Sequence, residues 1–403
     1  MEALVFDLKT KVLKHEKKHP MPEIVKDDDV IVKVAYSGVC GTDLHIMAGE
    51  FPARSDRPFT LGHEFSGVVH AVGPASAFRA GQKVVVDPNR PCNLCNHCRR
   101  SKYQFCSARA NIGVWVDGGW AGSVQLIILI ISSILKLSST TIIAPASVQS
   151  SSPCNLCNHC RRSKYQFCSA RANIGVWVDG GWAQYCVVSS LHVFLLPDGV
   201  SLAQGGLCEP YSCVSHGFDI ISPITVGQKI LICGAGIIGN LWITTLHHQG
   251  HRNITVSEMN TKRLEIVKNL QTGYRLVTPD VLEKEKNEVL YDVIIDCTGV
   301  GKVMEISFEY LNYGGKYVVF GCCPPTHQAN INVFKIYEKE LTIHGVKVNP
   351  FSFPNAIGWL SAMGDRYLNF EKLGVKVYAL SDYQAAFNDL KAGVISKAML
   401  KID

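Results

Sequence analysis

Three side chains near the start of the chain have the chemistry of a zinc site. Cys40 lies in the segment GVCGTDLH, and His63 and Glu64 lie in the segment GHE that follows it. Cys, His and Glu are all zinc ligands, and three protein ligands with an open fourth position are typical of catalytic zinc. These residue types predict a catalytic metal site. The alternative is a set of unrelated core residues, because a free Cys also packs as a small hydrophobe.

Two residues close to Cys40 are suited to moving a proton. Thr42 carries a hydroxyl and His45 an imidazole, two and five residues after Cys40. Both groups can accept a proton and pass it on. We therefore expect Thr42 and His45 to carry a proton from an alcohol bound at the metal site to solvent.

A glycine-rich loop in the middle of the chain predicts a nucleotide site. It reads GAGIIG, follows the apolar segment 229–233 and opens a segment with helix character. The glycines suit a tight turn, the close approach of a pyrophosphate, and packing of the helix on the strand. A glycine-rich turn without a ligand is the disfavoured alternative. The candidate contacts are Gly234, Gly236, Ile237, Ile238 and Gly239.

The identity of the cofactor depends on two residues beyond this loop. Glu258 follows the last glycine at the end of the next strand-like segment, 253–257. A carboxylate there accepts hydrogen bonds from ribose hydroxyls and repels a 2′-phosphate, which favours NAD. Arg263 leaves NADP as the alternative, because an arginine can bind that phosphate.

Eight of the 16 Cys residues form two clusters with the spacing C-x2-C-x2-C-x7-C. Four thiolates with this spacing indicate a closed structural zinc site, which leaves no position for substrate. The basic run 99–102 could instead suggest a nucleic-acid knuckle, but we favour a role in shielding the thiolate charges. The clusters are Cys92, Cys95, Cys98 and Cys106, and Cys154, Cys157, Cys160 and Cys168.

Both clusters belong to a perfect duplication. Residues 91–121 and 153–183 are identical, and the spacer 122–152 is rich in Ile, Leu, Ser and Thr. Two undiverged copies do not indicate a stacked repeat protein. We interpret 122–183 as an insertion from an exon included twice. The second copy continues without interruption into the following strand, so we expect it to fill the native position.

Composition indicates a protein of two domains that binds neither nucleic acid nor membrane. The chain has 403 residues, more than one ordinary core accommodates. The segment 122–183 holds five basic residues and one acidic residue, so it supplies +4 of the formal charge of +6. The longest unbroken apolar run in the spacer is six residues, too short for a membrane span. Free thiols and the lack of a signal peptide favour the cytoplasm.

Secondary-structure patterns divide the chain. Residues 1–90 read as short strands between Gly and Asp breaks, so catalytic residues are expected on loops. From residue 224, strands and helices alternate as in a doubly wound parallel sheet. The segment 353–403 returns to mixed short elements. The fold class predicted is therefore α/β with two domains.

The motifs, taken in order, resemble the zinc-dependent medium-chain alcohol dehydrogenases, closest to the polyol branch of sorbitol, xylitol and arabinitol dehydrogenases. The resemblance covers the chain apart from the inserted segment 122–183. It implies a GroES-like β-rich catalytic domain over 1–212, with the duplicated zinc lobe and spacer at 91–183. A Rossmann domain would follow over 213–345, and 346–403 would return to the catalytic domain.

The resemblance also implies roles for individual residues. Cys40, His63 and Glu64 match ligands of the catalytic zinc, with Glu64 exchanging with water. Glu209 matches a position that is Glu in polyol dehydrogenases, although the neighbouring Cys208 is a second candidate. Glu258 and Arg263 match the polyol branch around the adenosine ribose, so Arg263 is compatible with NAD.

The function expected is oxidation of a secondary hydroxyl of a polyol or related alcohol to a ketone, with hydride transfer to NAD. Zinc, catalytic and structural, and NAD are the cofactors implied, and a homo-oligomer, dimer or tetramer, is the assembly expected. Two alternatives stay open. One is another zinc alcohol or threonine-type dehydrogenase. The other is an inactive product of the duplication that retains zinc and nucleotide binding.

Overall fold

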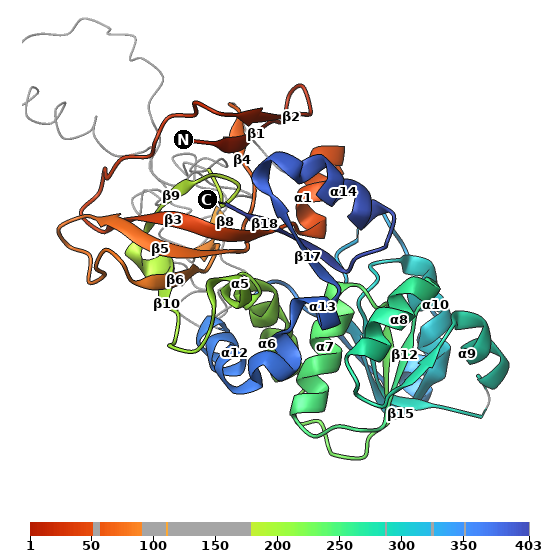
Figure 1. The fold of residues 1–403 in the computed structure, drawn as a ribbon. Coiled ribbons are helices and arrows are strands. Elements are labelled where there is room, and N and C mark those ends of the chain that lie inside the picture. The colour runs from red at the N-terminus through yellow and green to blue at the C-terminus, as the bar shows by residue number, and fades with distance from the viewer. Residues whose placement is uncertain are drawn as a thin grey trace, which may run out of the picture. The chain divides into compact units, whose positions relative to one another are not determined.

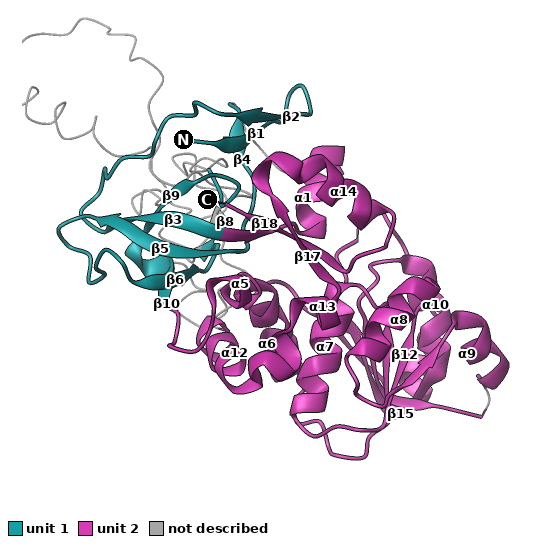
Figure 2. Ribbon diagram, in the orientation of Figure 1, with its two compact units in different colours: residues 1–35, 53–195, 403 teal, residues 36–52, 196–402 magenta. Residues whose placement is uncertain are grey.

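The computed structural model describes residues 1–50, 57–90, 110–111, 179–286, 288–323, 326–349 and 352–402. The eight clustered cysteines and the spacer 122–152 lie outside these residues. Two compact units are distinguished in Figure 2. Unit 1 comprises residues 1–35, 53–195 and 403, and unit 2 comprises residues 36–52 and 196–402.

Short strands dominate unit 1, as the Gly and Asp breaks predict. Strands β1 (Ala3–Asp7), β2 (Val12–Glu16) and β4 (Phe59–Thr60) form a sheet with the order β2-β1-β4. Two further short strands pair antiparallel, β7 (Asn89–Arg90) with β8 (Ala110–Asn111). The segment that carries His63 and Glu64 follows β4 directly.

A seven-stranded sheet has the order β10-β6-β5-β3-β18-β17, and β9 also pairs with β3. Strand β3 is ten residues long and mostly buried. Its end pairs antiparallel with β18, matching Gly38 to Met399. The strands are β3 (Asp29–Gly38), β5 (Phe65–Val72), β6 (Lys83–Val86), β9 (Tyr185–Ser189), β10 (Val193–Leu195), β17 (Val375–Ala379) and β18 (Lys397–Lys401).

Unit 2 contains a six-stranded parallel sheet with the order β13-β12-β11-β14-β15-β16. Strands β12 and β15 of this sheet are labelled in Figure 1. Strand β11 (Ile230–Cys233) is buried throughout, as parallel strands covered on both faces must be. This confirms the doubly wound sheet that the βα alternation predicts. The other strands are β12 (Ile254–Ser257), β13 (Arg275–Val277), β14 (Tyr291–Asp296), β15 (Leu311–Val319) and β16 (Thr342–Gly345).

Helices of unit 2 connect the strands of this sheet or flank it in sequence. Those between its strands are α7 (Ile237–His248), α8 (Thr261–Asn269), α9 (Pro279–Glu285), α10 (Gly301–Ser307) and α11 (Val333–Glu338). The others are α1 (Gly41–Ala48), α5 (Leu202–Gly205), α6 (Cys208–Ile221), α12 (Phe353–Leu368), α13 (Phe370–Leu373) and α14 (Tyr383–Lys391). Among the described residues, no helix has both the length and the apolar character needed to cross a bilayer.

Candidate metal and cofactor sites

Cys40 lies between a strand and a helix. Strand β3 ends at Gly38, and Cys40 keeps an extended backbone, with φ −93° and ψ 154°, as the residue that caps α1. The backbone N–H of Cys40 donates a 2.9 Å hydrogen bond to Oδ2 of Asp43, which is fully buried. A buried carboxylate in the first helical turn therefore fixes the backbone that presents the thiol.

His63 and Glu64 lie in the connection between β4 and β5. Gly62 allows the turn before them with φ +93°, a conformation that L side chains rarely adopt. Its carbonyl accepts a 2.7 Å hydrogen bond from the N–H of Gly181, and the N–H of Trp182 donates to the Leu61 carbonyl at 3.0 Å. Residues 180–182 therefore hold the backbone on which His63 and Glu64 lie.

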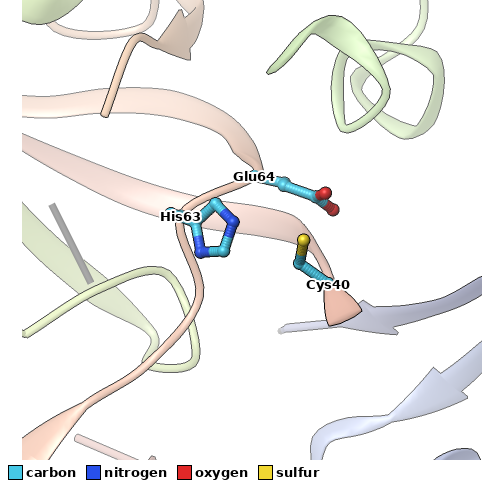
Figure 3. Close-up of side chains that lie close together, drawn as sticks. All are labelled: Cys40, His63 and Glu64. Carbon is cyan, nitrogen blue, oxygen red and sulfur yellow. The ribbon is translucent and has the colours of Figure 1, made fainter. Parts of the chain in front are cut away.

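The structure brings Cys40, His63 and Glu64 together (Figure 3). One ligand atom from each, sulfur, nitrogen and carboxylate oxygen, lies within 4.8 Å of the other two. His63 and Glu64 are buried and Cys40 is half-buried. Ligand atoms of a tetrahedral zinc lie roughly 3.5 Å apart, since Zn–S and Zn–N bonds are about 2.3 and 2.0 Å. The donor set of thiolate, imidazole and carboxylate fits zinc.

Glu209 is not part of that group of three. It is buried in the first turn of α6, where its Oε1 atom accepts a 3.6 Å hydrogen bond from the thiol of Cys213. Cys208, the alternative ligand, is also buried. Over the ranges that the structure describes, no second group of three such side chains reaches the same spacing.

Thr42 and His45 lie on α1 rather than on a loop, unlike the expectation for this part of the chain. The reason is local, because Cys40 and Asp43 cap the start of a helix whose last residue, Ala48, is followed by Gly49 with φ +79°. Thr42 is half-buried, and Nδ1 of His45 lies 2.7 Å from Oε2 of Glu50. The imidazole thus has a carboxylate partner near the protein surface.

The glycine-rich loop has the conformation that its sequence predicts. Gly234 follows β11 with φ +95°, which turns the chain sharply. Gly236 caps α7, and a Cβ built there would meet no atom within 4 Å. A Cβ at Gly239 would lie 2.0 Å from the Gly234 carbonyl oxygen. Gly236 therefore leaves space beside a helix N-terminus, where backbone N–H groups bind phosphate, and Ile237 and Ile238 begin that helix.

Glu258 is buried at the end of β12, the strand next to β11. Its Oε2 atom accepts a 2.8 Å hydrogen bond from the N–H of Ala235 in the glycine-rich loop, and Oε1 accepts one from the N–H of Asn260. The guanidinium of Arg263 lies 3.9 Å from Oε2. The carboxylate thus links the loop to the adjacent strand, with a partly exposed cation beside it.

The structure places other reactive groups near these sites that sequence patterns did not single out. Asp296, at the end of β14, accepts hydrogen bonds from the N–H and hydroxyl of Thr298, and burial raises the pKa of its carboxyl. Partial desolvation raises the pKa of the Cys322 thiol although the residue is exposed, and the nearby Cys40 raises that pKa further. Cys322 is therefore within electrostatic range of Cys40, although the two lie far apart in the sequence.

Two family profiles match the chain. The alcohol dehydrogenase GroES-like domain matches residues 26–129, and the zinc-binding dehydrogenase domain matches residues 238–362. Together they cover more than half of the chain. The first match includes Cys40, His63 and Glu64, and the second begins inside the glycine-rich loop.

Named relatives align over nearly the whole chain. D-arabinitol dehydrogenase 1 from Uromyces fabae is 24% identical over 94% of this chain and 91% of its own length. Sorbitol dehydrogenase from Halalkalibacterium halodurans is 26% identical over 96% of this chain and 94% of its own length. The solved structure of 2R,3R-butanediol dehydrogenase from Bacillus subtilis superimposes with a TM-score of 0.73 at 22% identity, covering 100% of this chain and 99% of that one.

Proposed function

We propose a reaction for this chain, which belongs to the zinc-binding dehydrogenases with a GroES-like alcohol dehydrogenase domain. The chain oxidises a secondary hydroxyl of a polyol or related alcohol to the ketone and transfers the hydride to NAD. The observation that carries this proposal is the group formed by Cys40, His63 and Glu64. A thiolate, an imidazole and a carboxylate are the donors expected of a catalytic zinc site.

Cys40, His63 and Glu64 would hold the zinc ion, and Glu209 is the further candidate ligand. When bound, zinc acts as a Lewis acid that lowers the pKa of a substrate hydroxyl. The chain's own residues bind the metal and fix its position. Cys40 is fixed by Asp43, and His63 and Glu64 by the backbone bonds of residues 180–182.

Thr42 and His45 would conduct the proton that the hydroxyl loses. Thr42 lies two residues after Cys40, and His45 lies one helical turn later on α1. The imidazole of His45 pairs with Glu50, which is exposed. An imidazole with a carboxylate partner at the surface can pass a proton to solvent.

NAD is the proposed cofactor. The open space at Gly236 suits a pyrophosphate, and the carboxylate of Glu258 suits the adenosine ribose. Glu258 opposes a 2′-phosphate by its charge, and Arg263 lies beside it with a compensating cation. Hence we expect NAD to be preferred over NADP.

A polyol is the proposed substrate class because the arabinitol and sorbitol dehydrogenases align over almost the whole chain. Glu209 supports the same branch, because it matches a position that is Glu in the polyol dehydrogenases. These relatives are about one-quarter identical, which supports the class of alcohol and not a particular one.

Substitution of the proposed ligands tests this function. Cys40→Ser and His63→Ala should each lower polyol-dependent NADH formation by about 100-fold or more, because each removes a ligand of the metal that activates the hydroxyl. NAD binding, followed by calorimetry, should stay within about twofold of the original chain, because neither residue lies in the glycine-rich loop. Near-normal turnover in either folded variant would contradict the assignment.

We also propose that the chain forms a homo-oligomer through the edge of its parallel sheet. Strand β16 is the last strand of that sheet, and α11 precedes it with three exposed side chains: Val333 at 72%, Phe334 at 61% and Tyr337 at 81% exposure. An exposed apolar group beside a strand at the edge of a sheet favours pairing with a second copy.

Sedimentation should give a molecular mass that is a multiple of the 44.3 kDa chain mass, and Tyr337→Glu should shift the measured mass toward that of a single chain. A monomeric original chain at micromolar concentration would refute this interface.

A further inference from the structure

Lys397 is a buried cation close to the proposed metal ligand Cys40. It begins strand β18, and only 1% of its surface is exposed. Burying an ammonium group is strongly unfavourable unless hydrogen bonds or charges compensate it. A methionine of similar length would fill the same space without this cost. A lysine at this buried position therefore indicates that its ammonium group has a role.

The ammonium group binds the backbone beside Cys40. Nζ of Lys397 donates a hydrogen bond to the carbonyl oxygen of Val39 at 3.3 Å. The next residue of β18, Ala398, accepts a 3.0 Å hydrogen bond from the N–H of Val39. Consecutive residues of one strand thus hold both backbone polar groups of Val39.

The peptide group between Val39 and Cys40 is held at both of its polar ends. Its carbonyl accepts from Lys397, and its N–H donates to the carboxylate of Asp43 at 2.9 Å. Both side chains are buried, with 1% and 0% exposure. A peptide plane fixed at both ends cannot rotate freely, and its orientation sets the direction of the Cα–Cβ bond of Cys40.

We propose that Lys397 is a positioning residue for the metal ligand Cys40. By holding the Val39 carbonyl opposite Asp43, it directs the thiol toward His63 and Glu64, whose ligand atoms lie within 4.8 Å of the sulfur. A metal site needs its ligands held within about 0.5 Å of the productive geometry. This inference rests on the proposed function only in taking Cys40 as a metal ligand.

Cobalt binding measures this role without any catalytic assay. Co²⁺ is added to the metal-free full chain, and absorption from thiolate to cobalt is recorded. The spectrum of Cys40→Ser is subtracted, which leaves the contribution of the Cys40 thiolate and removes that of the other cysteines. Lys397→Met should weaken this cobalt site about 10- to 100-fold, the usual effect of losing a group that orients a metal ligand.

Lys401→Met is the matched control. Lys401 ends the same strand but is exposed, so the same substitution there should leave the cobalt affinity of the Cys40 site within about twofold. Thermal unfolding of the metal-free proteins is measured in parallel. A Lys397→Met protein with wild-type cobalt affinity and a lower unfolding temperature would show a purely structural role and overturn the proposal.

Lys397→Gln provides a second variant if the first does not fold. It keeps a polar end on a shorter side chain, and it should also weaken the cobalt site, because the amide cannot reproduce the ammonium contact. Wild-type cobalt affinity in Lys397→Gln would overturn the proposal, as would failure of both variants to fold with excess zinc. If the Cys40→Ser spectrum equals that of the original chain, the metal site itself is wrong. If cobalt binds through Cys40 but no polyol is oxidised, only the proposed function fails.

Discussion

Gly236 and Gly239 belong to one loop, yet an added methyl group would meet different surroundings at each. Gly236 has open space around its Cβ position, whereas Gly239 faces the Gly234 carbonyl oxygen at 2.0 Å. The backbone at Gly236 has φ −71°, which alanine adopts without strain. One glycine therefore leaves space for a ligand, and the other allows the helix to approach the strand.

These two positions give a matched pair of predictions at the residue scale. Gly236→Ala should fold with an unchanged unfolding temperature but bind NAD about tenfold or more weakly, because the methyl group enters the space expected for the pyrophosphate. Gly239→Ala should lower the free energy of unfolding by about 1–3 kcal/mol, because an overpacked contact forces the backbone to shift. Calorimetric NAD titration and thermal unfolding measure the two effects. Unweakened NAD binding by Gly236→Ala would contradict the placement of the cofactor.

Residue types and spacing were enough to predict the three side chains that the structure brings together, and their role as metal ligands stays a prediction. Cys, His and Glu have side chains that commonly bind metals. Cys40 and His63 are also close enough in the sequence to be recognised as parts of one site. Lys397 and Cys322 could not be found in this way. Both lie far from Cys40 in the sequence, and only the pairing of β18 with β3 brings Lys397 beside Val39. A single lysine in the apolar run ISKAML is the one signal that the sequence offered.

At the scale of elements, the end of the second copy, residues 179–183, supports the backbone around His63. Trp182 is fully buried, and its carbonyl accepts a hydrogen bond from the N–H of Leu4 in β1. The carboxylate of Asp179 accepts one from the N–H of Thr60 in β4. A Cβ at Gly180 would lie 2.4 Å from the Gly62 carbonyl oxygen, so only glycine fits this approach.

The duplication supplies its own control for this element. Trp120 in the first copy corresponds to Trp182 in the second copy. Trp182→Ala should cost about 3–5 kcal/mol in free energy of unfolding, the range for truncating a buried aromatic residue. Trp120→Ala should cost less than about 1 kcal/mol, because Trp182 already fills the position between β1 and Leu61. Urea unfolding measures both costs. Equal costs would contradict the assignment of this position to the second copy, and reversed costs would show that the first copy fills it.

The two copies do not divide simply between a native and a surplus lobe. Strand β8, at residues 110–111 of the first copy, pairs with β7, whereas residues 179–183 of the second copy contact β1 and β4. The sequence favours the second copy because that copy continues directly into β9. Identical sequences have identical local preferences, so only tertiary contacts can choose between them. Which four cysteines form the structural zinc site stays a prediction.

At the scale of the whole molecule, the alternation of strands and helices predicted the parallel sheet well, because each βα unit is local in sequence. The compact units are harder to predict, since residues 36–52 group with 196–402 and not with their neighbours. That grouping depends on β3, β17 and β18 sharing one sheet, and such pairings between distant segments leave no periodic pattern. The boundaries at 212 and 345 stay a prediction.

Activity of the 403-residue chain depends on whether the site tolerates the inserted segment 122–183. Removing it would join Ala121 to Gln184, and the residues before the junction would have the same sequence as 153–183. The contacts of Asp179, Gly180 and Trp182 could then be made by their identical counterparts in the first copy. We therefore expect the chain shortened by this deletion to keep the arrangement around His63 and Glu64.

The most direct measurement is NADH formation by the zinc-loaded complete chain and by the chain lacking 122–183, with a panel of polyols, a simple secondary alcohol and threonine. We predict that both chains reduce NAD with at least one polyol, more efficiently than with the simple alcohol or threonine, and that a zinc chelator abolishes the reaction. Activity in the deletion alone would show that the duplication inactivates the complete chain. Absence of polyol-dependent NADH from both folded, zinc-loaded chains would contradict the account.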